Sequence, residues 1–200
     1  MKHIRHLKKD KILEPVIRKH GPVELSTNRN VFWYLCSSII SQQLSVSAAR
    51  TIKSRFLNLN ENKIPLPEEL LRIETEMMRQ AGLSEAKSCY LKNVASFAID
   101  KGLTYGKLNK MENEEVIEYL TEIKGVGRWT VEMVLMFSLG REDVFPVDDG
   151  GIIAAMKNLY GISSPDKKKR ITQMQKIAEN WVPYRSYACM YLWKFKDGKV

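Results

Sequence analysis

Cysteine is scarce in this 200-residue chain, and no apolar run reaches the length needed to cross a membrane. The three cysteines, Cys36, Cys89 and Cys189, are odd in number and far apart, which argues against a zinc cluster or an iron–sulfur centre. The first residues carry several cations but no apolar core of the kind that a signal peptide needs. We therefore expect reduced thiols, no bound metal, no membrane segment and a cytoplasmic protein.

Strand signals, internal repeats and low-complexity segments are also missing. Almost every segment instead has the apolar spacing of a helix, so the sequence predicts an all-α fold. We expect Asn30 to cap the second helix and Ser164-Pro165 to open a basic one. Helices are predicted over residues 8–20, 30–40, 44–56, 74–81, 85–101, 113–122, 128–139, 150–160 and 184–194, with a short one opening at Pro67.

Positive charge exceeds negative charge by a wide margin. The chain has 32 Lys plus Arg against 23 Asp plus Glu, a net charge of +9, with 44% hydrophobic residues for a core. An excess of this size favours a polyanionic partner, most plausibly nucleic acid. A basic protein without such a partner has the same composition, so charge alone does not identify one.

The stretch from Leu120 to Gly151 organises the chain. It predicts a helix end, a tight turn Ile123-Lys124-Gly125-Val126-Gly127, a second helix, and the pair Asp148-Asp149 opening a third. Two glycines around one small apolar residue permit a sharp turn, and Val126 can fill the space between the two helices. The exposed N–H groups at the start of the next helix can bind a phosphate. An ordinary helix–helix turn uses the same residues, so the glycines alone are a weak signal.

Together with Trp129-Thr130 and the aspartate pair, this hairpin resembles the helix–hairpin–helix superfamily of DNA glycosylases, closest to the 3-methyladenine DNA glycosylase II branch. The segments 38–45, 81–83 with Lys87, and 181–193 agree with it. The resemblance covers about residues 30–195 and implies the compact form, without an additional N-terminal α/β domain. It implies two helical lobes in a single unit of residues 1–200, with a DNA-binding cleft between them. We place the central lobe at about 36–140 and the second lobe at 1–35 plus 141–200.

The resemblance assigns catalysis to Asp149. A glycosylase extrudes a nucleotide from the duplex and breaks the bond between base and sugar, so the sugar becomes cation-like and needs a nearby carboxylate. Asp148 would then be the helix cap or a neighbouring structural carboxylate, although a one-residue shift would exchange the two. Capping is the commoner role of an aspartate before a helix. A helix N-terminus would also favour the charged form of Asp149.

The resemblance also implies the substrate. Trp129 stands where bifunctional relatives carry a lysine nucleophile, so we expect a monofunctional enzyme that leaves an abasic site. Alkylated purines such as 3-methyladenine and 7-methylguanine are cationic and suit aromatic faces. Trp129 and Trp193 match the pocket tryptophans of the family. Phe32 is a further candidate that could equally be core, and Met133 and Gly150 stand where some relatives have tyrosine. Lys194 also replaces a tyrosine, and we expect its cation to point away from a cationic base.

Double-stranded DNA with damaged bases is the expected partner of a monomeric protein. We expect this protein to be cytoplasmic and nucleoid-associated in a prokaryote, or intracellular generally. The loop that includes Gln42, Gln43 and Leu44 matches the family's wedge, which fills the hole left by the extruded base, and either Gln43 or Leu44 could be the wedge. Gly125, Gly127 and Thr130 match positions that hold phosphate or a monovalent cation, and no cofactor is implied. We expect additional charge from Lys124, Arg128, Arg185 and the run 167–170, which is more simply a solvated helix face.

Three other functions fit parts of the pattern. A helix–hairpin–helix module could bind DNA without chemistry, and a glycosylase could take deaminated or oxidised purines instead. An all-α scaffold for protein partners would not bind DNA. Loss of base release on changing Asp149 separates the enzyme from a binder.

Overall fold

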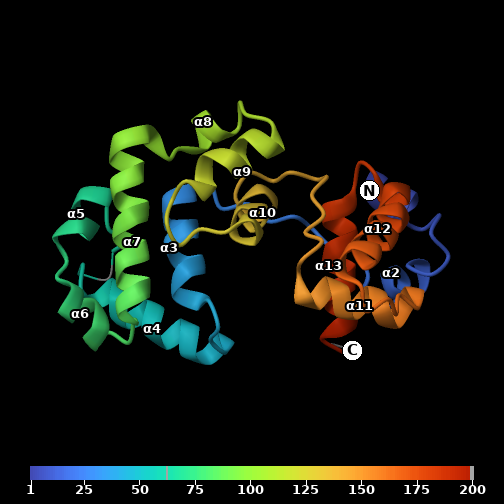
Figure 1. The fold of residues 1–200 in the computed structure, drawn as a ribbon, viewed down its shortest axis with the longest axis horizontal. Helices are drawn as coiled ribbons and strands as arrows, with labels where there is room; N and C mark the ends of the chain where they lie inside the picture. The colour runs from blue at the N-terminus through green and yellow to red at the C-terminus, as the bar shows by residue number, and fades with distance from the viewer. Residues whose placement is uncertain (62, 199–200) are drawn as a thin grey trace. The chain divides into compact units, whose positions relative to one another are not determined.

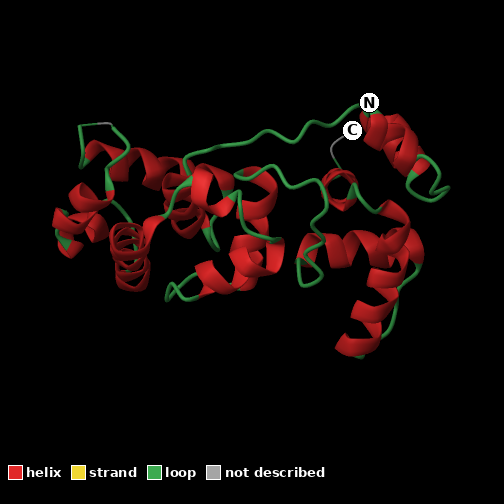
Figure 2. Cartoon of the chain, turned by 90° about the horizontal axis from the view of Figure 1, so that it is seen from above, coloured by secondary structure: helices red, strands yellow, loops and turns green. Residues whose placement is uncertain are grey.

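The computed structural model of the protein describes residues 1–61 and 63–198, and every regular element within these ranges is helical (Figure 1, Figure 2). The predicted all-α class is confirmed. The chain forms two compact units: unit 2 is the continuous segment Asn28–Leu139, and unit 1 combines Met1–Thr27 with Gly140–Val200. In the described part of the chain, no helix has the length and apolar character needed to cross a bilayer.

Unit 2 is built around α3 (Val31–Ser41), which packs against α4 (Val46–Asn58), α7 (Glu85–Phe97) and α10 (Arg128–Phe137). Helix α3 lies at the centre of the core, because its residues Leu35, Ile39 and Ile40 are completely buried. Asn30 caps α3 as predicted, because its Oδ1 accepts the N–H of Trp33 at 3.0 Å. The other elements are α5 (Pro67–Arg72), α6 (Thr75–Gln80), η1 (Ala98–Gly102), α8 (Tyr105–Leu108) and α9 (Asn113–Thr121).

Unit 1 joins the N-terminal segment to the C-terminal part of the chain. Its elements are α1 (Lys2–Leu7), α2 (Glu14–His20), α11 (Gly150–Tyr160), α12 (Lys167–Ala178), η2 (Glu179–Trp181) and α13 (Arg185–Lys196). Helix α13 packs against both α11 and α2. The carboxylate of Asp10 accepts hydrogen bonds from the Tyr160 hydroxyl at 2.7 Å and from Trp181 Nε1 at 2.8 Å. One side chain near the N-terminus therefore ties together elements that lie 150 and 171 positions later.

The predicted helix over 8–20 is wrong. The segment forms α1 and α2, separated by a turn in which Asp10 Oδ1 accepts the N–H groups of Ile12 and Leu13 at 2.9 and 3.1 Å. A helix over 8–20 would place Pro15 in its interior, where proline has no N–H to donate. The structure places Pro15 in the first turn of α2, where that N–H is not needed.

Two other boundaries differ from the expected ones. Unit 2 begins at Asn28 rather than near residue 36, because Val31 and Leu35 of α3 are buried within it. Helix α12 begins at Lys167, after Ser164-Pro165, because Asp166 accepts the N–H groups of Lys168 and Lys169 at 2.8 and 3.2 Å. Aspartate and serine are similarly good N-cap residues. Asp166 can therefore take the cap position that Ser164 was expected to occupy.

Candidate active site

Asp149 is a buried carboxylate at the start of a helix. Its side chain is 8% exposed, and Oδ1 accepts the backbone N–H of Ile152 in the first turn of α11 at 2.8 Å. The same oxygen accepts the indole N–H of Trp193 at 2.9 Å. Two N–H donors thus hold this oxygen at the N-terminus of the helix. The carboxylate is therefore fixed in one orientation.

Gly151 makes room for this arrangement. A Cβ atom at this position would lie 2.9 Å from Trp193 Cδ1, 3.1 Å from Asp149 Oδ1 and 3.3 Å from Trp193 Nε1. Real Cβ contacts of 2.9 Å are almost never seen. The indole can reach Asp149 only because residue 151 has no side chain. At the neighbouring Gly150, a Cβ would meet nothing within 4 Å.

Asp148 does not cap α11, so the first of the two roles expected for it, helix cap or neighbouring carboxylate, is excluded. Its side chain is 55% exposed and forms an ion pair with Lys167 Nζ at 2.9 Å. Asp149 is the cap. A cap side chain must sit one residue before the first helical residue to reach the N–H groups of the first turn. Asp148 remains a neighbouring carboxylate paired with the start of α12.

The hairpin in unit 2 has two glycines with different roles. Gly125 has φ +103°, and a Cβ there would overlap the ring of Tyr90 on α7. Gly127 has φ −95° and ψ 166°, and a Cβ there would meet nothing within 4 Å. Backbone conformation and packing thus require glycine at 125 but not at 127. Val126 between them is 5% exposed, as expected for a residue that fills the turn.

Gly127 occupies the N-cap position of α10. Because glycine has no side chain, it makes no capping hydrogen bond there. The start of this helix therefore has no side-chain cap from Gly127, and a helix N-terminus attracts anions. Lys124, in the same hairpin, is exposed, and Asn93 Nδ2 donates to its carbonyl at 3.0 Å. The turn is therefore held from both sides by α7, through Tyr90 and Asn93.

Arg128 is occupied by carboxylates of its own unit. Its guanidinium donates to both oxygens of Glu114 at 2.6 and 3.0 Å and to Glu132 Oε1 at 3.3 Å. The hydrogen bond to Glu114 raises the pKa of Arg128, more than burial lowers it. The same bond lowers the pKa of Glu114. These contacts join α9 to α10 across the hairpin. Arg185 in unit 1 is similarly paired with Asp143, at 2.6 and 2.8 Å.

The loop between α3 and α4 is anchored by a lysine. Lys87 Nζ donates to the carbonyl oxygens of Ile40 at 2.9 Å and Gln42 at 2.7 Å, and burial lowers its pKa below the ordinary value. Gln42 Nε2 lies 3.5 Å from Thr130 Oγ1 on α10. Gln43 has φ +59°, a conformation that few residues other than glycine adopt. Leu44 is 37% exposed. The loop therefore presents Gln43 and Leu44 from a fixed base.

The aromatic and pocket candidates differ in exposure. Trp129 is 42% exposed at the start of α10, whereas Phe32 and Met133 are each 7% exposed within unit 2. Trp193 is half-buried on α13 in unit 1. Lys194 lies near His20, whose pKa is lowered first by burial and then by this ammonium. The burial of Phe32 and Met133 favours a packing role for both.

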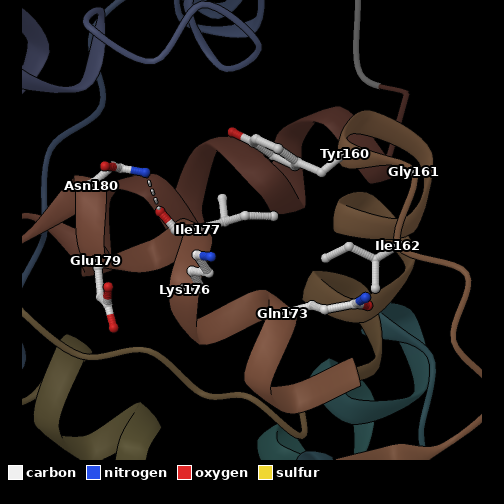
Figure 3. A pocket seen from close by; sticks show the side chains of 8 residues that line it. All are labelled: Tyr160, Gly161, Ile162, Gln173, Lys176, Ile177, Glu179 and Asn180. Atoms are coloured by element: carbon white, nitrogen blue, oxygen red, sulfur yellow. Dashed lines mark hydrogen bonds between the residues drawn. The ribbon is translucent and has the colours of Figure 1, made fainter. Parts of the chain in front are cut away.

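A hollow of about 540 Å³ lies elsewhere in unit 1, where the end of α11 faces α12 and η2 (Figure 3). Its lining residues are Tyr160, Gly161, Ile162, Gln173, Lys176, Ile177, Glu179 and Asn180. None of the residues predicted to act in catalysis or binding lines it.

Sequence reasoning did not assign the roles of Gly151, Tyr90 and Lys87. The second glycine of Asp148-Asp149-Gly150-Gly151 gave one signal, because a glycine inside a helix has a conformational cost and needs a packing reason. Lys87 follows a predicted turn at Gly82-Leu83, but nothing local shows that its partners lie 45 and 47 positions earlier.

Comparison with known proteins identifies the family. Residues 36–181 match the HhH-GPD superfamily of base excision DNA repair proteins. The chain belongs to this superfamily. The matched range contains the hairpin of unit 2 and the aspartate pair of unit 1, and these are the features that carry the resemblance in the sequence.

Individual HhH-GPD relatives are similar over nearly the whole chain. The chain is 37% identical to DNA-3-methyladenine glycosylase 1 of Schizosaccharomyces pombe, over 92% of this chain and 80% of that protein. Among solved structures, a DNA-3-methyladenine glycosidase from Bacillus halodurans has a TM-score of 0.84 at 40% identity, covering 98% of this chain and 89% of the other. A 3-methyladenine DNA glycosylase of S. pombe in complex with abasic DNA has a TM-score of 0.85 at 35% identity, covering 98% and 97%.

Proposed function

We propose that this protein is a monofunctional DNA glycosylase that removes alkylated purines from duplex DNA and leaves an abasic site. The carrying observation is the Asp149 carboxylate, which is buried, caps α11 and accepts the indole N–H of Trp193. Its relatives named as 3-methyladenine glycosylases support the reaction class. Such an enzyme acts inside the cell, where DNA lies.

The reaction breaks the bond between the purine nitrogen and the sugar carbon C1′. The electron pair of that bond leaves with the base, and C1′ gains positive character. A fixed carboxylate stabilises this charge without reorganising during the reaction. Water then forms the new C–O bond at C1′ and loses a proton. We assign to Asp149 both the stabilisation of the sugar cation and the orientation of that water.

The product follows from the residue at position 129. A lysine amine could attack C1′, form a Schiff base and lead to strand cleavage. The indole of Trp129 has no such nucleophile. Lys124, in the hairpin, is assigned to phosphate contact rather than chemistry. We therefore expect an intact strand that carries an abasic site.

The substrate is assigned through its charge. A purine methylated at N3 or N7 is cationic, which weakens its bond to the sugar and attracts it to an aromatic face. We assign contacts with the extruded base to Trp129 and Trp193. Trp193 is hydrogen-bonded to Asp149, and Trp129 is 42% exposed. Phe32 and Met133 support the surrounding core.

We assign the grip on DNA to the hairpin and to the loop that contains Gln42, Gln43 and Leu44. The N–H groups beyond Gly127 bind a phosphate, with Lys124 adding charge, and Val126 and Thr130 shape the turn. This hairpin can also hold a monovalent cation between itself and the phosphate. Arg128, paired with Glu114 and Glu132, positions α10 rather than binding phosphate itself.

The decisive experiment is base release from methylated duplex DNA, identified by chromatography. We expect 3-methyladenine and 7-methylguanine from the wild-type protein. Asp149→Asn should release neither while still binding DNA, and Asp148→Asn should retain release. Release by Asp149→Asn and not by Asp148→Asn would transfer the catalytic role to Asp148. No release of any base, with DNA binding intact, would leave a binding module. Strand cleavage without heat or added base would contradict the monofunctional assignment.

A further inference from the structure

A groove of about 540 Å³ runs along α4 in unit 2. Leu44 and Val46 contribute apolar surface at one end, and Arg50 and Lys53 contribute positive charge along the helix. Its remaining lining residues are Ser41, Ala49, Ser54 and Leu57. The groove is therefore amphipathic and carries no acidic side chain.

The charge of α4 has one sign. The helix contains Arg50, Lys53 and Arg55 and no aspartate or glutamate. In the described part of the chain none of the three lies within ion-pair distance of a carboxylate. Arg128 in the same unit is paired by two carboxylates. Helix α4 therefore offers three cations of one sign that can act on an external anion.

The apolar side chains beside these cations are exposed. Val46 is 79% exposed and Leu44 is 37% exposed. Exposed aliphatic side chains beside unpaired cations suit a partner in which apolar groups alternate with anionic groups. The sugar–phosphate backbone of DNA has this character, with a deoxyribose between successive phosphates.

The groove is shaped before a partner arrives. Lys87 fixes the carbonyls of Ile40 and Gln42, and Gln43 takes the left-handed conformation that turns the chain into α4. Ser45 then caps α4, because its Oγ accepts the N–H of Ala48 at 3.2 Å. A surface held in this way loses little conformational entropy on binding.

We propose that this groove binds the sugar–phosphate backbone of duplex DNA, with Arg50 and Lys53 on phosphates and Leu44 and Val46 against deoxyribose. This inference rests on the proposed function, since it takes DNA as the partner. It extends the contact assigned to the loop that contains Leu44 along α4, away from the hairpin.

The helix supplies its own control. At about 100° per residue, Arg50 and Lys53 lie about 60° apart around α4, whereas Arg50 and Arg55 lie about 140° apart. Arg50 and Arg55 are both exposed, yet only Arg50 lines the groove. Replacing either arginine by glutamine removes the same charge from the same helix. Any difference between the two variants therefore reports on the groove rather than on net charge.

The test is fluorescence anisotropy of a duplex that contains a tetrahydrofuran abasic-site analogue, titrated with protein over a series of salt concentrations. Each phosphate contact contributes about 0.9 to the slope of log Kobs against log salt. Arg50→Gln and Lys53→Gln should each weaken binding about three- to tenfold and lower the slope by about 0.9. Arg55→Gln should change affinity less than about twofold and leave the slope unaltered.

Equal effects of Arg50→Gln and Arg55→Gln would overturn the proposal, as would unchanged binding by Arg50→Gln and Lys53→Gln. Thermal unfolding midpoints equal to that of the wild type would show that all three variants are folded. Release of methylated purines by the wild-type protein tests the proposed function separately. The groove assignment can thus fail while the glycosylase assignment stands.

Discussion

Trp193 and Asp149 share a hydrogen bond of 2.9 Å, in which the indole N–H donates to the oxygen that also caps α11. The tryptophan therefore orients the carboxylate as well as presenting an aromatic face. Trp193→Phe keeps an aromatic ring and removes the donor. A hydrogen bond to a charged group contributes about 1.5–3 kcal/mol, so we expect excision to slow about 10- to 100-fold under single-turnover conditions. Excision at the wild-type rate would show that the indole N–H has no positioning role.

Gly151 and Gly150 offer a matched pair of alanine substitutions. Gly151→Ala places a Cβ 2.9 Å from Trp193 Cδ1, so the ring must move and the hydrogen bond to Asp149 is lost. We expect a loss of excision similar to that of Trp193→Phe. Gly150→Ala meets nothing within 4 Å and should raise the free energy of unfolding by about 0.5 kcal/mol, because alanine restricts the unfolded chain. Chemical denaturation and single-turnover excision measure the two effects. Equal activity of both alanine variants would contradict this account.

The two hairpin glycines should separate stability from DNA binding. Gly125 has φ +103°, and the Cβ of an alanine there would clash with Tyr90. Gly125→Ala should therefore lower the free energy of unfolding by about 1–3 kcal/mol. Gly127→Ser should remain stable, because serine is a good N-cap residue. Its hydroxyl would occupy the N–H groups that we assign to phosphate, so affinity for duplex DNA should fall. Denaturation midpoints and DNA titrations, run on both variants, give the comparison. If the folded Gly127→Ser variant bound DNA as tightly as the wild type, the phosphate contact could not be assigned to the start of α10.

Lys87 is predicted to hold the loop that fills the space of the extruded base. Lys87→Met leaves the carbonyls of Ile40 and Gln42 without their donor, at a cost of about 1–3 kcal/mol in stability. Excision from duplex DNA should slow about tenfold, equivalent to roughly 1.4 kcal/mol. Excision from single-stranded DNA should slow less, because no base has to be extruded. Lys87→Arg should recover part of the loss. The same slowing on both substrates would indicate only a general loss of structure.

His3 should make stability depend on pH. Its ring stacks on Tyr187 with centroids 3.9 Å apart, and burial lowers its pKa below the ordinary value. Between the lowered folded pKa and the unfolded pKa, the unfolded chain binds more protons. Stability is therefore fully present above the unfolded pKa and falls as pH drops through this window. His3→Phe keeps a stacked ring without titrating. The free energy of unfolding of the wild type and of His3→Phe should be measured near neutral pH and in mild acid. In acid, the wild type should lose more of this free energy than His3→Phe does. A difference independent of pH would contradict the neutral, buried histidine.

The helical class, the hairpin and the cap at Asn30 follow from local patterns, and local patterns predict them well. Apolar spacing defined the central helices because each buries one face in its unit. The predicted first helix is wrong because it would place Pro15, which has no N–H to donate, in a helix interior. Of the two roles allowed for Asp148, the structure excludes the cap of α11, which is Asp149, and leaves the neighbouring carboxylate.

Non-local relationships could not be predicted from the sequence. The partners of Lys87 and the ring beneath Gly125 come from other helices, and their residues carry no mark of the contact. Charge gave the right overall expectation of a polyanionic partner without showing which cations are paired. Arg128 and Arg185 were expected to add positive charge, and each is paired with carboxylates of its own unit. The roles assigned to Asp149, Trp129 and the loop around Gln43 stay predictions until excision is measured.

The discontinuity of unit 1 has a consequence for synthesis on the ribosome. Unit 2 is one continuous segment and can fold as soon as it emerges. Asp10, in contrast, must wait for Tyr160 and Trp181, and Asp149 must wait for Trp193 near the end of the chain. A nascent chain can therefore hold a folded unit 2 before Asp149 gains its hydrogen bond from Trp193. If Asp149 acts as proposed, base removal requires α13 of unit 1 as well as a folded unit 2.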